Sequence, residues 1–205
     1  MPHIIETTVY EFHELADDWD WWDSVYDDFE EVCRILGIEL RTRSVPLMGG
    51  GTRQDPCIWF RGFSSQGDGA CFEGTYTYAK RAAGHIREHA PKDTDLHRIA
   101  DRLFAIQLDN FFQLRADIRH CGRYYHAYSM EVSVERDSPT YQSLTDGAED
   151  AVTEALRDLA NWLYRQLERE WDHMMSDEYA DDAIVANEYT FTAGGKWFGC
   201  QSRND

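Results

Sequence analysis

The residues that could do chemistry are concentrated at 60–74, where small and polar residues separate two aromatic segments. Gly62, Gly67 and Gly69 would permit positive φ and a close approach of the backbone to a ligand. Such a loop could bind an anion through its backbone N–H groups or a cation through Asp68. The ligand-binding candidates are Ser64, Ser65, Gln66, Gly67, Asp68 and Gly69.

A purely structural role for this loop stays open. The same residues are typical of a β-hairpin with a Gly-Asp-Gly turn, in which Asp68 accepts hydrogen bonds from its own backbone. The loop differs from the phosphate-binding P-loop because no Gly-Lys-Ser/Thr follows it. It also differs from the dinucleotide-binding pattern, in which GxGxxG opens a helix.

Two histidines, His120 and His126, are the other candidates for catalysis, together with Asp68. They flank a predicted hairpin turn, where facing imidazoles could transfer protons or bind a metal. A zinc site would need a third ligand, for which only Asp68, Glu73 or His97 could be brought near by folding. Histidines stacked on aromatic rings or lying on the surface are the alternative. No HExxH motif occurs, and the sequence predicts no metal and no cofactor.

Residues 17–29 interleave acidic and aromatic residues. An exposed face of this kind would bind a basic partner, because aromatic residues dominate binding hot spots. The alternative is an amphipathic helix with Trp22, Tyr26 and Phe29 inward and the aspartates in solvent. Trp21 fits that alternative least well, because its neighbour already points inward. The partner-binding candidates are Trp21, Asp20, Asp23, Asp27 and Asp28.

The charge is uneven along the chain, which has a net charge of −18. Residues 1–33 hold eleven acidic residues and no Lys or Arg, and residues 146–182 hold twelve acidic and three basic residues. These acidic ends argue against nucleic-acid binding there and favour a partner with a basic surface. We expect residues 11–31 and 146–182 to form one negative surface.

Five scattered cysteines without a CxxC motif predict buried thiols and a cytoplasmic location. No apolar run suits a membrane, so no membrane partner is expected.

Hydrophobic periodicity predicts one α+β domain over residues 1–205. It comprises an N-terminal acidic helix at 13–36, a sheet core at 38–135 and a C-terminal helical part at 146–187. Hairpins at 57–78 and 116–135 are expected in one antiparallel sheet of about four to six strands, covered by long helices. Further predictions are strands at 9–12, 38–45 and 189–192, a helix at 80–89, a helix capped by Asp93 or Thr94 that runs to 114, and a helix over 146–174.

Several motifs along the chain resemble a widespread family of uncharacterised proteins of bacteria and their phages. They include Trp21-Trp22, the stretch 62–72 that reads GFxSQGDGAxF, the stretch 90–93, and the HxGRYYH stretch at 120–126. Members of that family are often labelled "antitoxin of a toxin–antitoxin stability system". Arg61 departs from the pattern, because a small residue is expected before Gly62. The resemblance implies a phage or mobile-element accessory protein and supplies no activity.

The sequence therefore favours binding over catalysis. Neither a nucleophile elbow nor a Cys–His pair of known spacing occurs. The leading hypothesis is an acidic accessory protein that binds a host macromolecule; an inhibitor of a nucleic-acid-handling defence complex fits its acidic surface. The alternatives are a small-ligand- or metal-binding enzyme centred on the 64–69 loop and the 120–126 hairpin, and an antitoxin-like partner of a toxin.

Overall fold

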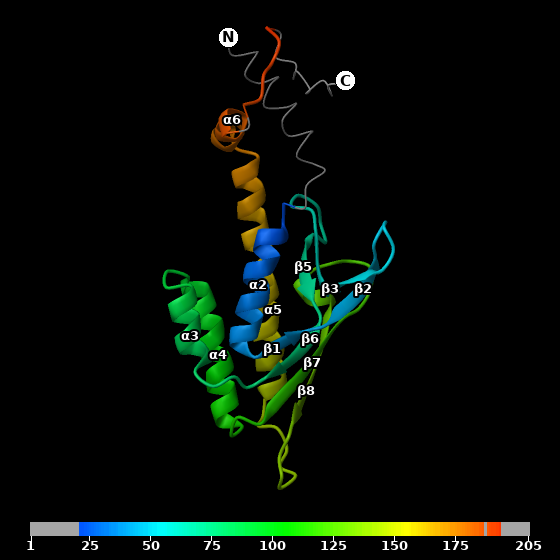
Figure 1. Ribbon diagram of the computed structural model, residues 1–205. Coiled ribbons are helices and arrows are strands. Elements are labelled where there is room, and N and C mark those ends of the chain that lie inside the picture. The colour runs from blue at the N-terminus through cyan, green and yellow to red at the C-terminus, as the bar shows by residue number, and fades with distance from the viewer. Residues whose placement is uncertain (1–20, 187, 194–205) are drawn as a thin grey trace. The chain divides into compact units, whose positions relative to one another are not determined.

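The computed structural model describes residues 21–186 and 188–193 of the chain. The chain divides into two compact units, one comprising 1–24 with 167–205 and the other comprising 25–166. Helices and antiparallel strands both contribute to the described residues, which confirms the predicted α+β class. Figure 1 shows the helices and strands of the described residues.

A four-stranded antiparallel sheet forms the centre of the larger unit, in the order β1-β6-β7-β8. Its strands are β1 (Ile38–Leu40), β6 (Gly74–Thr77), β7 (Leu114–His120) and β8 (Met130–Arg136). Alternation along β7 buries Leu114, Ala116 and Ile118 on one face, whereas Arg115 and Arg119 are exposed on the other. This is the pattern of a sheet with one covered and one solvated face.

Two further strand pairs meet this sheet at a three-way junction. They are β2 (Thr42–Pro46) with β3 (Thr52–Pro56), and β4 (Ile58–Arg61) with β5 (Gly69–Phe72). At the junction Arg41 N donates to Glu73 O (2.9 Å), Glu73 N to Cys57 O (2.9 Å) and Cys57 N to Arg41 O (2.7 Å). Each of three long strands thus pairs with one neighbour before its junction residue and with the other neighbour after it.

The covered face of the sheet packs against helices on one side (Figure 1). They are α2 (Asp23–Leu36), α3 (Ala82–His89), α4 (Thr94–Asp109) and the first part of α5 (Ala148–Met174). Phe29 of α2 contacts Phe72 of β5 and Trp162 of α5, with ring centroids 5.3 and 6.4 Å apart. Burial of these aromatic and aliphatic side chains supplies the main stabilisation of this unit.

Two helix ends lie at the residues that the sequence indicated. Gly37 ends α2 with φ of 84°, and Thr77 O would lie 2.3 Å from a Cβ at this position. Asp93 caps α4 by accepting a hydrogen bond from Leu96 N (2.9 Å), and its other oxygen accepts from Trp162 Nε1 (2.7 Å). Both helix ends were predicted.

The smaller unit contains the end of α5 and α6 (Asp177–Ala186). Ser176 caps α6, since its Oγ accepts a hydrogen bond from Tyr179 N (3.2 Å). Trp21 packs on Trp171, with ring centroids 5.4 Å apart. Met174 and Ala180 are buried.

Several predicted elements differ from the structure. The hairpin at 57–78 is not wholly part of the main sheet, because only β6 joins it while β4 and β5 pair separately. The strand predicted at 38–45 breaks at Arg41, and the charged strand β3 was not predicted. The α4 helix ends at Asp109 rather than at 114, and residues 188–193 form no strand. The predicted strand at 9–12 and the helical residues 13–20 lie outside the described residues.

Among the described residues, no helix is long and apolar enough to cross a membrane.

Candidate functional site

The carboxylate of Asp68 is occupied by the backbone of the 62–69 loop. Asp68 Oδ2 accepts hydrogen bonds from Ser64 N (3.0 Å) and Ser65 N (2.6 Å), and Asp68 N donates to Ser65 O (3.1 Å). Gly67 has φ of 95°, and a Cβ on Gly62 would lie 2.7 Å from Asp68 Oδ2. The carboxylate therefore shapes the turn, as the structural alternative requires.

This loop packs against the connection between β7 and β8. A Cβ on Gly67 would lie 3.3 Å from the Tyr124 ring, and a Cβ on Gly69 would lie 2.6 Å from Cβ of His126 and 2.8 Å from its Cα. Positive φ, predicted for Gly67 or Gly69, occurs at Gly67. The two turns thus lie together, and glycine is needed at 69 because the backbone of the second turn approaches closely.

The two histidines make separate local contacts. His120 Nε2 lies 2.9 Å from Tyr124 O, and its ring is tilted against Trp59 and Tyr125 at centroid distances of 5.6 and 5.0 Å. His126 Nδ1 instead accepts from Tyr128 N (3.1 Å). The described residues contain no group of three or more His, Cys, Asp or Glu side chains arranged to hold a metal.

The other proposed zinc ligands are also engaged. Glu73 Oε1 accepts from His120 N (3.1 Å), and His97 Nε2 lies 2.8 Å from Ala90 O. Burial raises the pKa of the Cys71 thiol to about 12, and a hydrogen bond to Glu131 raises the pKa of Cys121. Nucleophilic cysteines instead have a lowered pKa, so neither thiol is activated for attack.

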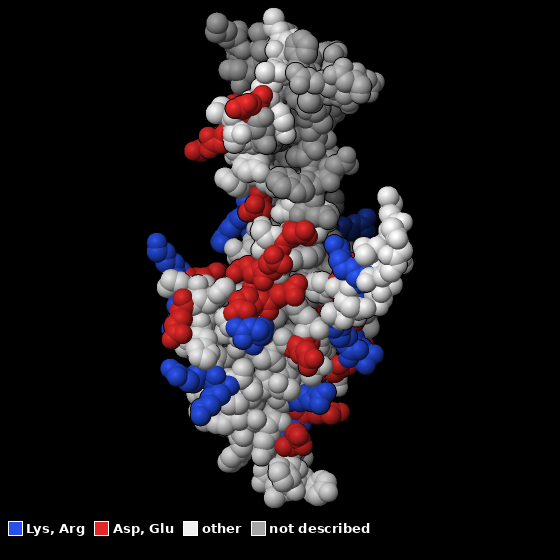
Figure 2. All heavy atoms as spheres, in the orientation of Figure 1, with Lys and Arg blue, Asp and Glu red and all other residues white. Residues whose placement is uncertain are grey.

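Carboxylates without partners lie elsewhere, along α2. Figure 2 shows acidic residues gathered over this helix. A groove of about 630 Å³ runs between α2, β1 and the β2–β3 hairpin. Its acidic lining is Asp27, Glu30, Glu31 and Glu39, together with Arg34. Among the described residues, Asp27, Glu30 and Glu39 accept no hydrogen bond and form no ion pair.

The groove is electrostatically unbalanced. Burial, and then the negative charge of Asp27, raise the pKa of Glu30. Glu31 is instead paired with Arg34 (2.5 Å), and the bond to Arg34 lowers the pKa of Glu31. Asp27 and Glu30 repel one another, so a cation placed between them would be stabilised.

A second groove of about 450 Å³ shares Glu31 and Arg34 with the first. It is also lined by Lys80, His85, Glu88 and His89. The Glu31–Arg34 ion pair thus forms a wall common to both grooves, and only the first groove is dominated by negative charge.

The residues predicted to bind a partner do not all line the acidic groove. Asp27 lines the acidic groove, whereas Asp28 pairs with His89 Nε2 (2.8 Å). Asp23 is exposed, and Trp21 is half-buried against Trp22 and Trp171. Asp20 lies outside the described residues. The single negative surface proposed for 11–31 and 146–182 stays a prediction.

Sequence reasoning missed most of the groove. Glu30, Glu31 and Glu39 were counted among the acidic residues but not singled out as a site. The helical spacing of Asp27 with Glu30 and Glu31 was a usable signal, because residues three and four apart share a helix face. Glu39 and Gln54 had no such signal, since the three-way junction brings their strands beside α2.

The fold and the groove define an α+β protein with an acidic recess beside its central sheet. Residues 21–177 match the family described as Domain of unknown function (DUF8835), and the chain belongs to that family. No curated protein and no solved structure matches the chain.

Proposed function

We propose that the protein is an accessory protein of a phage or mobile element that binds a basic surface of a host macromolecule through the groove beside α2. The observation that carries this proposal is the recess of about 630 Å³ lined by four carboxylates and one arginine. Three of those carboxylates have no cationic partner among the described residues, which leaves them available to an incoming Lys or Arg side chain.

The energetics favour such a partner. The raised pKa of Glu30 reflects partial burial and repulsion from Asp27, and a guanidinium or ammonium group between the two would relieve this repulsion. The net charge of −18 would also steer a basic partner toward the protein and speed association at low salt.

The same arrangement supports an inhibitor of a nucleic-acid-handling protein. A protein that binds phosphate has a basic surface, and closely spaced carboxylates compete for the same surface. The catalytic alternative is less well supported, because the carboxylate of Asp68 and the rings of His120 and His126 all make local contacts with their own turns.

Quantitative affinity capture from host lysate tests the proposal. The tagged protein is compared with a variant carrying Asp27→Lys and Glu30→Lys, and captured proteins are identified by mass spectrometry. We expect the main partner to be reduced at least about tenfold, which corresponds to about 1.4 kcal/mol. Surface charges contribute little to stability, so circular dichroism should show the fold retained.

A matched control carries Glu149→Lys and Asp150→Lys, two exposed residues in the first turns of α5. It changes the net charge equally but leaves the groove intact, and it should capture the partner as the wild type does. Equal capture by the groove variant and the wild type at low salt would overturn the proposal.

A further inference from the structure

A row of aromatic rings lies on the connection between β7 and β8. Tyr124, His126 and Tyr128 alternate along the chain, with ring centroids 6.4 Å apart at each step. His126 has extended backbone, with φ of −152° and ψ of 167°, and it precedes the short 3-10 helix Ala127–Ser129, which contains Tyr128. The ring contacts place the three side chains together. The two tyrosines are 40% and 76% exposed, respectively.

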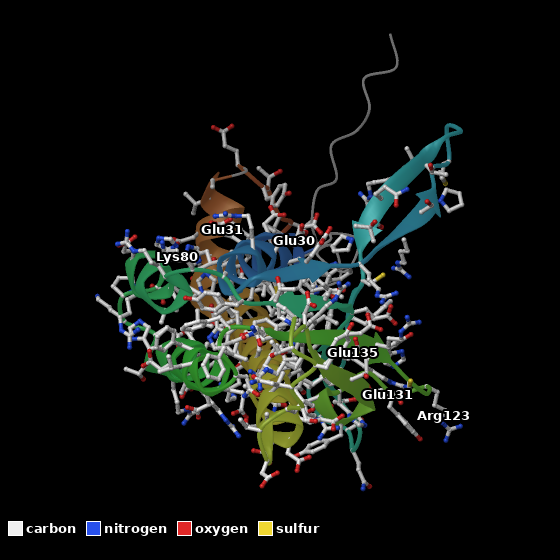
Figure 3. All side chains as sticks on the ribbon, turned by 90° about the horizontal axis from the view of Figure 1, so that it is seen from below. Glu30, Glu31, Lys80, Arg123, Glu131 and Glu135 are labelled. Carbon is white, nitrogen blue, oxygen red and sulfur yellow. The ribbon has the colours of Figure 1, made fainter. Side chains whose placement is uncertain are left out.

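Arginine side chains lie at both ends of this row. The Arg123 guanidinium lies 5.0 Å from the centroid of the Tyr124 ring, and that of Arg157 lies 5.2 Å from the Tyr128 ring. Arg123 projects from the outer end of the connection, beyond Glu131 (Figure 3). Arg61 lies beside the middle of the row, because it pairs with Gly69, which packs on His126.

About half of the arginines of the described residues form ion pairs with carboxylates. Those in ion pairs are Arg34, Arg41, Arg53, Arg87, Arg98, Arg102, Arg119 and Arg165. Within the same part of the chain, Arg61, Arg123 and Arg157 form none. Nε of Arg157 is also buried without a hydrogen-bond partner.

The nearby carboxylates are engaged by other groups. Asp68 accepts from the backbone of its own loop, and Glu131 accepts from the thiol of Cys121 (3.2 Å). Carboxylates farther than about 10 Å are largely screened at 0.1 M salt. Neither carboxylate forms an ion pair with Arg61, Arg123 or Arg157, so the three guanidinium groups remain available to phosphates.

We propose that this row binds single-stranded nucleic acid. Bases would stack on the exposed rings of Tyr124 and Tyr128, and phosphates would contact Arg61, Arg123 and Arg157. Aromatic rings flanked by cations are the chemistry that binds single strands without sequence preference, because every base offers a π face and every nucleotide a phosphate. A duplex fits less well, since stacking hides the faces of its bases. This inference goes beyond the binding of a basic partner, which involves α2.

Fluorescence anisotropy with labelled oligo-dT and oligo-rU tests the inference. Oligonucleotides of about 12 nucleotides are suitable, because a single-strand-binding domain contacts about 4 to 16 nucleotides. Titrations at several salt concentrations should give saturable binding that weakens as salt rises. Tyr128→Ala should weaken binding about tenfold through the loss of one stacked base. Arg123→Gln should weaken binding and reduce the slope of log K against log[salt] by about 0.7.

Matched controls are Tyr141→Ala and Lys92→Gln, which remove an exposed ring and an exposed charge elsewhere and should leave binding unchanged. Competition separates the possible ligands, because polyphosphate carries charge without bases and polyglutamate represents an acidic protein. Displacement by unlabelled oligonucleotide at much lower concentrations than by either polymer supports the inference. Absence of saturable binding at low salt, equal effects of the control variants, or preference for polyglutamate would overturn it.

Discussion

The 62–69 loop and the groove beside α2 both carry polar residues that could bind a ligand, but they use them differently. In the loop, Asp68 Oδ2 accepts hydrogen bonds from the backbone N–H groups of Ser64 and Ser65. In the groove, Asp27 and Glu30 face one another without such partners, and the pKa of Glu30 is raised. Polar groups that satisfy each other build structure, whereas carboxylates left together in a recess are available to a ligand.

The largest effect is expected at the packing of the loop. A Cβ on Gly69 would lie 2.6 Å from Cβ of His126 and 2.8 Å from its backbone, and Gly69 is buried. We expect Gly69→Val to lower the free energy of unfolding by about 3 kcal/mol, because the neighbouring backbone would have to move. Urea denaturation followed by circular dichroism measures this change.

The control for this experiment is Gly84→Ala in α3, where nothing lies within 4 Å of the added Cβ. It should raise the free energy of unfolding by up to about 1 kcal/mol through helix propensity. A Gly69→Val protein as stable as the wild type would show that the two turns do not pack as described.

A smaller effect is expected when the turn loses its carboxylate. Asp68→Ala removes the acceptor for Ser64 N and Ser65 N, both of which belong to exposed residues. We expect a loss of about 1 kcal/mol, because water can replace part of the lost hydrogen bonding. Differential scanning calorimetry measures the loss, and Ser65→Ala is a control that keeps both backbone donors and the carboxylate. An unchanged midpoint in Asp68→Ala would contradict a structural role.

The smallest effect concerns Glu30 and its dependence on pH. Its pKa is raised in the folded protein by burial and by Asp27, so folding favours the protonated form. Its contribution to stability is therefore greatest below the pKa of the unfolded chain and is lost as pH rises through the folded value. We expect Glu30→Gln to stabilise the protein at neutral pH by less than about 0.5 kcal/mol, because the side chain is mostly exposed.

Urea denaturation of wild type and Glu30→Gln at neutral pH and near pH 3.5 checks this, since a model carboxyl is largely protonated below about pH 4. The difference between the two proteins should shrink at the lower pH. Destabilisation by Glu30→Gln at neutral pH would show that the carboxylate is stabilised in the groove rather than repelled.

Much of the fold could be predicted from helix patterns and from the residues that end helices. Gly37 and Asp93 mark helix ends in both sequence and structure. The three-way junction could not be predicted, because Arg41, Cys57 and Glu73 are joined through backbone groups that every residue type except proline carries. The β3 strand has no apolar alternation, so its pairing leaves no trace in the hydrophobic pattern.

Another part that could not be predicted is the turn after α4. Phe111 and Phe112 adopt φ of 56° and 60°, values that bulky residues rarely take. Two buried amides hold the turn: Gln107 binds both backbone polar groups of Leu114, and Asn110 binds Thr145. Glycine is the usual signal for such backbone, and its absence hid the turn from sequence reasoning.

The candidate site was predictable only in part. The polar turns of the 62–69 loop and the 120–126 hairpin suggested that the two lie close together. In the structure they pack against each other at Gly67 and Gly69. The groove could not be predicted, because tertiary contacts decide which carboxylates lack partners. Asp27 and Asp28 are neighbours in sequence, yet only Asp28 pairs with His89.

The most direct measurement compares Asp27→Asn with Asp68→Asn, for both partner capture and unfolding free energy. The account predicts that Asp27→Asn reduces the captured partner per folded molecule and leaves stability unchanged or slightly higher. It predicts that Asp68→Asn lowers stability and leaves capture per folded molecule unchanged. The reverse pattern, with capture dependent on Asp68 and indifferent to Asp27, would contradict the assignment of the groove as the binding site.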